Sequence, residues 1–249
     1  MDTYKKLCAE FYDLSKTHAP PDALEFHLSC LESAAEPVLE PMCGSGRFLI
    51  PFLERGIDID GVDASQYMLQ ACHNRCQRKG LKPILYQQLL QELDLPREYG
   101  YIFIPAGSFG LITDSMDAVE SLRRLYRHLL PGGKLLLEIE TPRAKPEPLN
   151  KWHESRVTRP DGAEIVFNAL PMYDPKEQLQ RDVHRYELFM NGHLIESDVE
   201  DLSLRLYEPA QFRRLLVATG FTDIRVTRPY DDAAPTGEES AVIFRCRKP

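Results

Sequence analysis

A glycine-rich turn between two apolar runs constrains this chain more than any other feature. The run Val38-Leu39-Glu40 leads into Pro-Met-Cys-Gly-Ser-Gly at positions 41–46, and a second apolar run closes on Asp63. This order predicts a buried strand, a turn whose backbone can approach a ligand, the start of a helix, and a second strand that ends in a carboxylate. A helix N-terminus offers free N–H groups to an anion, and a carboxylate can bind two ribose hydroxyls. We therefore expect a pocket for a cofactor that contains a nucleoside.

The glycine spacing separates two classes of cofactor that use this arrangement. Dinucleotide sites carry G-x-G-x-x-G, but Leu49 occupies the third glycine position here, which disfavours a nicotinamide oxidoreductase. The stretch instead resembles motif I of the class I S-adenosylmethionine (SAM)-dependent methyltransferases, E/D-x-G-x-G-x-G. Glu40, Gly44 and Gly46 match that motif, and Met42 stands at its first glycine. The resemblance implies SAM as the cofactor.

The order of strands and helices extends this resemblance over most of the chain. We expect strands near 37–40, 57–63, 84–86, 101–104 and 134–139, and helices near 22–34, 46–55, 65–80 and 117–130. Such alternation predicts a parallel sheet with right-handed crossovers. The turn at 131–133, Pro-Gly-Gly, resembles the one that leads into strand five of the family. The expected fold class is therefore α/β, with a doubly wound, mostly parallel, seven-stranded Rossmann-like sheet.

The pattern changes after residue 140. A proline-rich stretch is followed by Asp161-Gly162 and Asn191-Gly192, two hairpin signals that are each flanked by alternating apolar and polar residues. They predict four antiparallel strands inserted after strand five. A helix at 209–220 and strands at 224–227 and 241–246 then complete the main sheet. We expect residues 1–140 and 208–249 to form the SAM-binding domain, and 141–207 to form an insertion that covers the substrate site.

Composition limits the partners and the compartment. The net charge is −8, and acidic residues outnumber basic ones in both halves of the chain, so nucleic acid is a poor substrate for it. The sequence has no secretory signal and no run long enough to span a membrane, which indicates a cytoplasmic protein. The six cysteines lack the spacing of a zinc site, and we expect no metal. The oligomeric state is left open.

The resemblance implies a role for each residue of the cofactor site. Asp63 would accept both ribose hydroxyls. Glu40 would hold the methionine end through water or backbone, although a structural role fits it equally well. Further implied cofactor contacts are Tyr12 as a cover, the backbone of Met42, Cys43 and Gly44, and the side chains of Ala64 and Met68, the last of which fits a plain core role equally well. The family commonly has an acid for the adenine amine where this chain has Leu89, so adenine must bind the backbone of Leu89 and Leu90 or another polar group.

The loop after strand four, Pro105-Ala-Gly-Ser-Phe109, would meet the substrate. It lacks the Asn/Asp-Pro-Pro-Tyr sequence that binds planar amides or adenine, and it resembles the loop of small-molecule methyltransferases. By that resemblance Ala106 lies near the cofactor, while Ser108 and Phe109 face the substrate. Cys43 fails as a nucleophile because it lies in the cofactor turn and has no predicted base beside it.

The predicted insertion offers further substrate contacts. By the two-residue period, Arg205 and Tyr207 share a strand face that is exposed or borders a cavity, while the leucines between them face the core. Trp152 and Tyr186 could complete an aromatic lid, and with arginine such a lid would suit a carboxylate or phosphate. No general base stands out among His153, His184 and Tyr186.

Together these patterns predict a methyltransferase that acts on a nitrogen or oxygen of a small polar metabolite. Two alternatives remain open from the sequence alone. One is a methyltransferase for protein or RNA, against which the acidic composition counts. The other is a non-catalytic SAM-binding regulatory protein, for which Met42 and Leu89 are the supporting departures from the family pattern.

Overall fold

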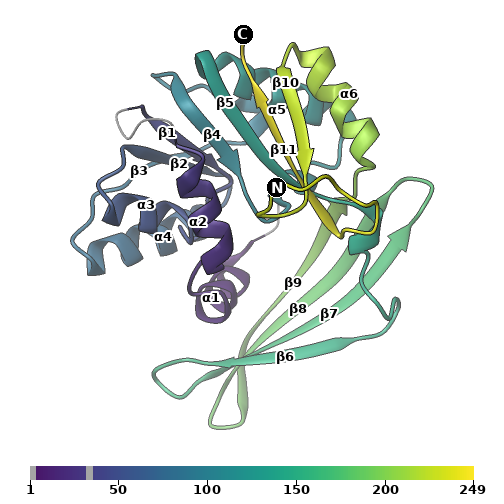
Figure 1. Ribbon diagram of the computed structural model, residues 1–249. Helices are drawn as coiled ribbons and strands as arrows, with labels where there is room; N and C mark the ends of the chain where they lie inside the picture. The colour runs from purple at the N-terminus through teal and green to yellow at the C-terminus, as the bar shows by residue number, and fades with distance from the viewer. Residues whose placement is uncertain (1–3, 32–35) are drawn as a thin grey trace.

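The computed structural model describes residues 4–31 and 36–249. Its centre is a seven-stranded sheet with the order β10-β11-β5-β4-β1-β2-β3 (Figure 1). The strands are β1 (Val38–Pro41), β2 (Ile59–Asp63), β3 (Ile84–Gln87), β4 (Tyr99–Ile104), β5 (Leu129–Glu140), β10 (Thr222–Thr227) and β11 (Ala241–Arg247). All neighbouring pairs are parallel except those made by β11, which runs antiparallel to both β5 and β10. The α/β fold class expected from the sequence is confirmed.

Helices cover both faces of this sheet. One hydrophobic cluster joins it to α2 (Pro21–Ser29), α3 (Leu49–Glu54) and α4 (Gln66–Arg78). A second cluster, on the other face, includes α5 (Ser115–Arg127) and α6 (Pro209–Thr219). Two of these helices begin as their sequences dictate: Ser65 Oγ accepts the N–H of Met68, and the Asp114 carboxylate accepts the N–H of Met116 and of Asp117.

Three predicted boundaries differ from the structure. The helix expected from residue 46 starts only at Leu49, because Gly46 has a φ of 81° and the chain turns until Phe48. The helix expected to reach 130 ends at Arg127, and β5 already contains the Pro-Gly-Gly sequence, whose glycines are bonded to Lys248. The helix expected at 22–34 ends at Ser29, and its last predicted residues lie outside the described part of the chain.

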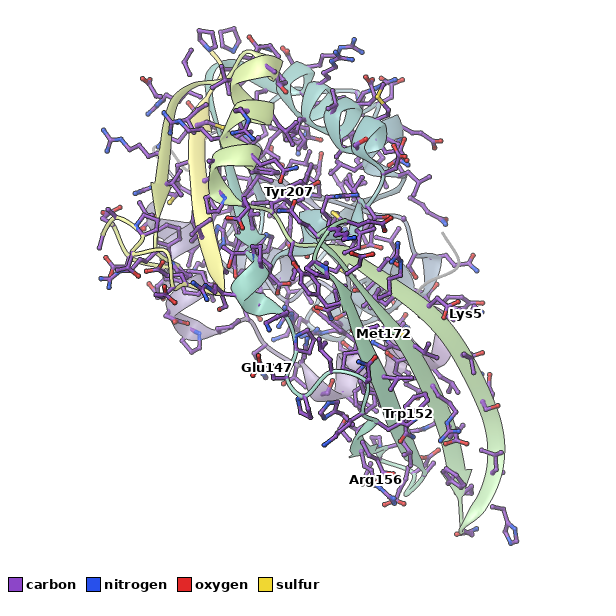
Figure 2. All side chains as sticks on the ribbon, turned by 90° about the vertical axis from the view of Figure 1, so that its right-hand side faces the viewer. Lys5, Glu147, Trp152, Arg156, Met172 and Tyr207 are labelled. Atoms are coloured by element: carbon purple, nitrogen blue, oxygen red, sulfur yellow. The ribbon has the colours of Figure 1, made fainter. Side chains whose placement is uncertain are left out.

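A second sheet follows β5 and consists of four antiparallel strands in the order β6-β7-β8-β9. They are β6 (His153–Thr158), β7 (Glu164–Asp174), β8 (Leu179–Met190) and β9 (His193–Arg205). Gly162 and Gly192 have φ angles of 86° and 77°, as the two predicted hairpin turns require. The long curved strands extend away from the main sheet (Figures 1 and 2). The insertion expected after strand five is therefore present.

Helix α1 (Lys6–Ser15) lies between the two sheets. Its residues Leu7 and Cys8 form a small buried cluster with Tyr186 and other apolar residues of the second sheet. On its other side, Asp13 forms an ion pair of 3.1 Å with Arg75 of α4. The helix thus joins the insertion to the cofactor-binding half of the main sheet. No helix within residues 4–31 and 36–249 is long and apolar enough to cross a membrane.

Candidate functional site

A cleft opens at the carboxyl ends of β1 to β4, where ligands of open α/β sheets bind. The segments that follow these strands form its walls, and α1 and the residues before it form its cover. The cleft brings together these predicted site residues: Tyr12, Met42, Gly44, Asp63, Ala64, Met68, Leu89, Leu90 and Ser108. Seven further lining residues were not predicted: Tyr4, Val62, Ser65, Gln88, Gln91, Leu111 and Ile112.

Asp63 is fixed at the centre of the cleft by two backbone bonds. Gly44 N–H donates to Oδ2 and Ser65 N–H donates to Oδ1, each over 2.8 Å. Burial raises the pKa of this carboxyl, and the backbone donors partly offset that effect. Each carboxylate oxygen has a second lone pair. The carboxylate can therefore accept hydrogen bonds from two ribose hydroxyls and still keep its bonds to the backbone N–H groups of Gly44 and Ser65.

Met42 keeps the backbone path that a glycine would give. Its φ is 58°, in the left-handed region that glycine populates without strain, and this explains why the motif has glycine there. Its side chain lines the cleft. Gly44 has a φ of 55°, and a side chain at Gly46 would lie 2.6 Å from Cys72 Sγ. The departure at Met42 thus changes the wall of the cleft but not the course of the turn.

Glu40 lies behind this turn with 2% of its surface exposed. Burial raises the pKa of its carboxyl well above the usual range, while nearby Arg47 and the N–H of Leu49 lower it. Its Oε2 atom is buried and has no hydrogen-bond partner among the residues described. A buried acceptor without a donor costs about 1–3 kcal/mol, and the α-ammonium of a methionine moiety would relieve that cost. The carboxylate therefore fits the amino-acid end of SAM.

Tyr12 covers the same end of the cleft. The guanidinium of Arg47 lies 5.3 Å from the centre of its ring, and the ammonium of Lys16 lies 5.1 Å from it. Burial raises the pKa of the Tyr12 hydroxyl, which keeps it a proton donor at neutral pH. Two cations and a hydroxyl donor beside the cleft suit the carboxylate of the methionine moiety.

The opposite end of the cleft is apolar and suits adenine. Val62, Met68 and Leu90 are buried there. The Gln88 amide is occupied, because it both donates to and accepts from the backbone of Asp94. Gln91 lines the cleft and its Nε2 donates to Asp117 Oδ2 over 3.4 Å, which leaves its amide oxygen available.

The prediction that Phe109 and Tyr207 contact substrate is wrong. Both rings are buried in the main core, and both pack against Phe212, with ring centres 5.4 and 5.1 Å away respectively. The alternation assumed for Tyr207 ends too early, since β9 stops at Arg205. The N–H of Tyr207 then donates to the carbonyl of Glu140, and the side chain turns into the core.

Arg205 does not face a cavity, contrary to its prediction. Its guanidinium donates to the carbonyl oxygens of Thr113 and Glu177, so it ties the end of β9 to the loop before α5. Tyr186 is also mispredicted, because its ring stacks on Phe167 at 4.7 Å under α1. Trp152 is 52% exposed outside the cleft, with the guanidinium of Arg185 above its ring.

Three predicted cofactor residues do not line the cleft: Glu40, which lies behind the turn, Cys43 and Ala106. The thiol of Cys43 is buried in the core beneath the turn, as expected for a residue that offers only its backbone. Ala106 is exposed, and its N–H donates to Glu138 Oε2 over 2.9 Å.

The sequence offered few signals for the lining residues that were not predicted. Tyr4 is brought to the cleft by Glu200, which lies 196 residues further along the chain and whose carboxylate accepts the N–H groups of Tyr4 and Lys5.

Comparison with known proteins points to the methyltransferases. Residues 38–133 match the family model described as a methyltransferase domain. The chain is 24% identical over 243 residues to YqeM of Bacillus subtilis (strain 168), whose name assigns it provisionally to the methyltransferases. That alignment covers 96% of this chain and 95% of the relative.

Solved structures share the whole fold. A SAM-dependent methyltransferase from Clostridium acetobutylicum ATCC 824 matches with a TM-score of 0.79 and 17% identity over 99% of each chain. The sugar N-methyltransferase KedS8 from Streptoalloteichus sp ATCC 53650 matches with a TM-score of 0.68 and 19% identity, over 99% of this chain and 89% of that one. The family match, the full-length relative and the shared fold agree: residues 38–133 carry a methyltransferase domain, and the chain has the class I SAM-dependent methyltransferase fold with an antiparallel β insertion.

Proposed function

We propose that this methyltransferase modifies a nitrogen or oxygen of a small polar molecule. The observation that carries the proposal is the contact of the second sheet with the loop after β4. A side chain at Gly110 would lie 2.8 Å from the carbonyl oxygen of Arg205 and 3.0 Å from Leu204. The acceptor space beside Ser108 is therefore narrow, and a small molecule fits it better than a folded protein or RNA. The sugar N-methyltransferase named among the similar structures supports the same class.

Within this proposal, different residues bind different parts of the cofactor. SAM supplies an electrophilic methyl group on a sulfonium. Asp63 binds the ribose, Glu40 receives the α-ammonium, and the amide oxygen of Gln91 accepts the adenine amine. Tyr4 and Tyr12 cover the bound molecule and exclude water from it. Catalysis then depends mainly on alignment of the acceptor with the methyl group, which can supply several kcal/mol of the barrier.

We propose residues 141–207 as the unit that covers the acceptor side. The carboxylate of Glu200 on β9 accepts the N–H of Tyr4 over 2.8 Å and that of Lys5 over 2.7 Å. Arg205 holds the other end of β9 to the carbonyl of Thr113. The insertion is thus fixed to the main domain on both sides of the cleft, and this arrangement supports a closed reaction chamber.

Calorimetric titration with SAM tests the proposal first, with NADH as the control. We expect SAM binding in the micromolar range and no NADH binding. Incubation with radiolabelled SAM and a panel of small metabolites should then label a member of the panel, whereas bulk RNA and a mixed protein extract stay unlabelled. Binding of SAM without transfer to any class would favour a regulatory protein, and labelled RNA or protein would overturn the choice of a small acceptor.

A further inference from the structure

Glu140 occupies a position beside the cleft that the family resemblance does not explain. It ends β5, next to the loop that follows β4. A side chain at Gly107 would lie 2.7 Å from Glu140 Cγ and 3.1 Å from Glu140 Oε1. The side chain therefore rests on the backbone immediately before Ser108, which lines the cleft.

Two glutamates on the same face of β5 differ in their bonding. Glu138 is occupied, because its Oε2 accepts the N–H of Ala106 over 2.9 Å and the hydroxyl of Tyr230 over 2.8 Å. The Glu140 carboxylate receives no hydrogen bond from any residue in the described ranges. Its pKa is raised to about 7, mainly by burial and also by the negative charges of Glu138 and Asp182, while the charge of Lys16 acts in the opposite direction.

Asp182, on the second sheet, is close enough to Glu140 for its charge to raise the pKa of that carboxyl. It is 8% exposed and lies on β8, on the strand face that Tyr186 shares. Its Oδ2 accepts the amide of Gln180 over 2.7 Å and lies 3.6 Å from Nε2 of His184. Its Oδ1 is buried with no partner among the residues that the structure describes. A buried carboxylate oxygen in this state lacks a donor, and an acceptor substrate can supply one.

We propose that the acceptor is a protonated amine, that Asp182 binds its ammonium group, and that Glu140 removes its proton. This inference rests on the proposed function and narrows its acceptor. Two carboxylates at one chamber favour a cation over the carboxylate or phosphate that the sequence suggested. A base with a pKa near neutrality also suits an ammonium better than a hydroxyl, because a hydroxyl is a far weaker acid.

The Glu140 carboxylate takes one proton from the ammonium and becomes a carboxylic acid, which leaves a neutral amine. The nitrogen lone pair forms the N–CH3 bond while the C–S bond breaks, and the electrons of that bond stay on sulfur. The products are a methylated ammonium and neutral S-adenosylhomocysteine. Glu140 then releases its proton to solvent and is ready for another cycle.

The first test needs no substrate. Protein labelled with 13C at the glutamate side-chain carboxyl is titrated by NMR, and Glu140→Gln identifies the signal. We expect a midpoint near pH 7 that Asp182→Asn lowers, because it removes a negative charge, and that Lys16→Met raises. Glu154→Gln, at an exposed position on β6, should leave the midpoint unchanged. A midpoint near 4.5, or one that neither Asp182→Asn nor Lys16→Met moves, would overturn the inference.

The second test uses paired acceptors, such as glucosamine with glucose and tyramine with 4-hydroxyphenethyl alcohol. We expect methyl transfer to amines only. Glu140→Gln should lower the rate at pH 7 by at least a hundredfold without changing SAM affinity, and activity should return near the pKa of the amine itself. Methyl transfer to the alcohols alone would refute the proposal that the acceptor is an amine, but it would still agree with a small-molecule substrate. If Glu140→Gln methylates amines at the wild-type rate, Glu140 is not the general base. If no compound is methylated, the NMR titration decides.

Discussion

The backbone N–H of Gly44 donates to Oδ2 of Asp63 over 2.8 Å, so the turn after β1 and the end of β2 support one another. We expect Asp63→Ala to weaken SAM binding by more than tenfold, since charge-assisted hydrogen bonds contribute about 1.5–3 kcal/mol. Calorimetry measures the change. The control is Asp201→Ala, which removes an exposed carboxylate on β9. Equal SAM affinity in Asp63→Ala and wild type would remove the ribose role.

Gln91 should determine recognition of the adenine amine. Gln91→Leu keeps the size of the side chain but removes the acceptor, and SAM affinity should fall about 5- to 30-fold, as expected for one hydrogen bond of about 1–2 kcal/mol. The wild type should prefer SAM over its analogue with a 6-oxo group in place of the amine. The variant should bind the two with similar affinity. A preference that survives in Gln91→Leu would assign adenine recognition to the backbone near Leu89.

Arg205 should act on stability rather than on cofactor binding. Arg205→Ala removes the bonds to the carbonyl oxygens of Thr113 and Glu177, and we expect a loss of about 1–2 kcal/mol in the free energy of unfolding. Arg205→Lys should restore little, because an ammonium cannot reproduce the planar fork. Urea denaturation measures both variants, and SAM affinity should be unchanged. A variant as stable as the wild type would contradict the proposed fixation of β9.

His27 should make stability depend on pH. Burial between Phe48 and Phe103 lowers its pKa to about 3, so the folded state disfavours the imidazolium that the unfolded state accepts near pH 6.5. Protonation therefore favours unfolding below pH 6.5, by up to about 1.4 kcal/mol for each pH unit down to about pH 3. His27→Phe should remove this pH-dependent contribution to the free energy of unfolding. Urea denaturation between pH 7 and 5 should show a stability difference between the two proteins that changes with pH, and a constant difference would contradict it.

The main sheet could be predicted because its signals are local and repeat along the chain. The strand that ends at Asp63 and the Ser65 cap both follow from a few neighbouring residues, as does the hairpin at Gly192. Predicted site residues next to strand ends were placed for the same reason: Asp63 and Gly44, expected to bind the cofactor, and Ser108, expected to face the substrate, all line the cleft.

The acceptor side could not be predicted in this way. Whether Tyr186 faces substrate or α1 depends on a helix that lies more than 170 residues away in sequence. The role of Arg205 depends on two carbonyl groups from other segments, and an alternating strand pattern carries no information about them. Glu140 and Asp182 influence one another only once the two sheets have folded together. The sequence pattern predicts contacts within each sheet, but it does not predict the contacts between the two sheets.

Gly107 leaves only enough room for the Glu140 side chain that rests on it. The φ of 68° at Gly107 also penalises any larger residue, so the two positions are constrained together. Among homologous proteins, the residues at positions 107 and 140 should therefore change together. An ancestor could gain the acid only after the glycine, and a descendant that replaces the glycine should already have lost the acid. The order of these two substitutions would then date the appearance of the chemistry at this site.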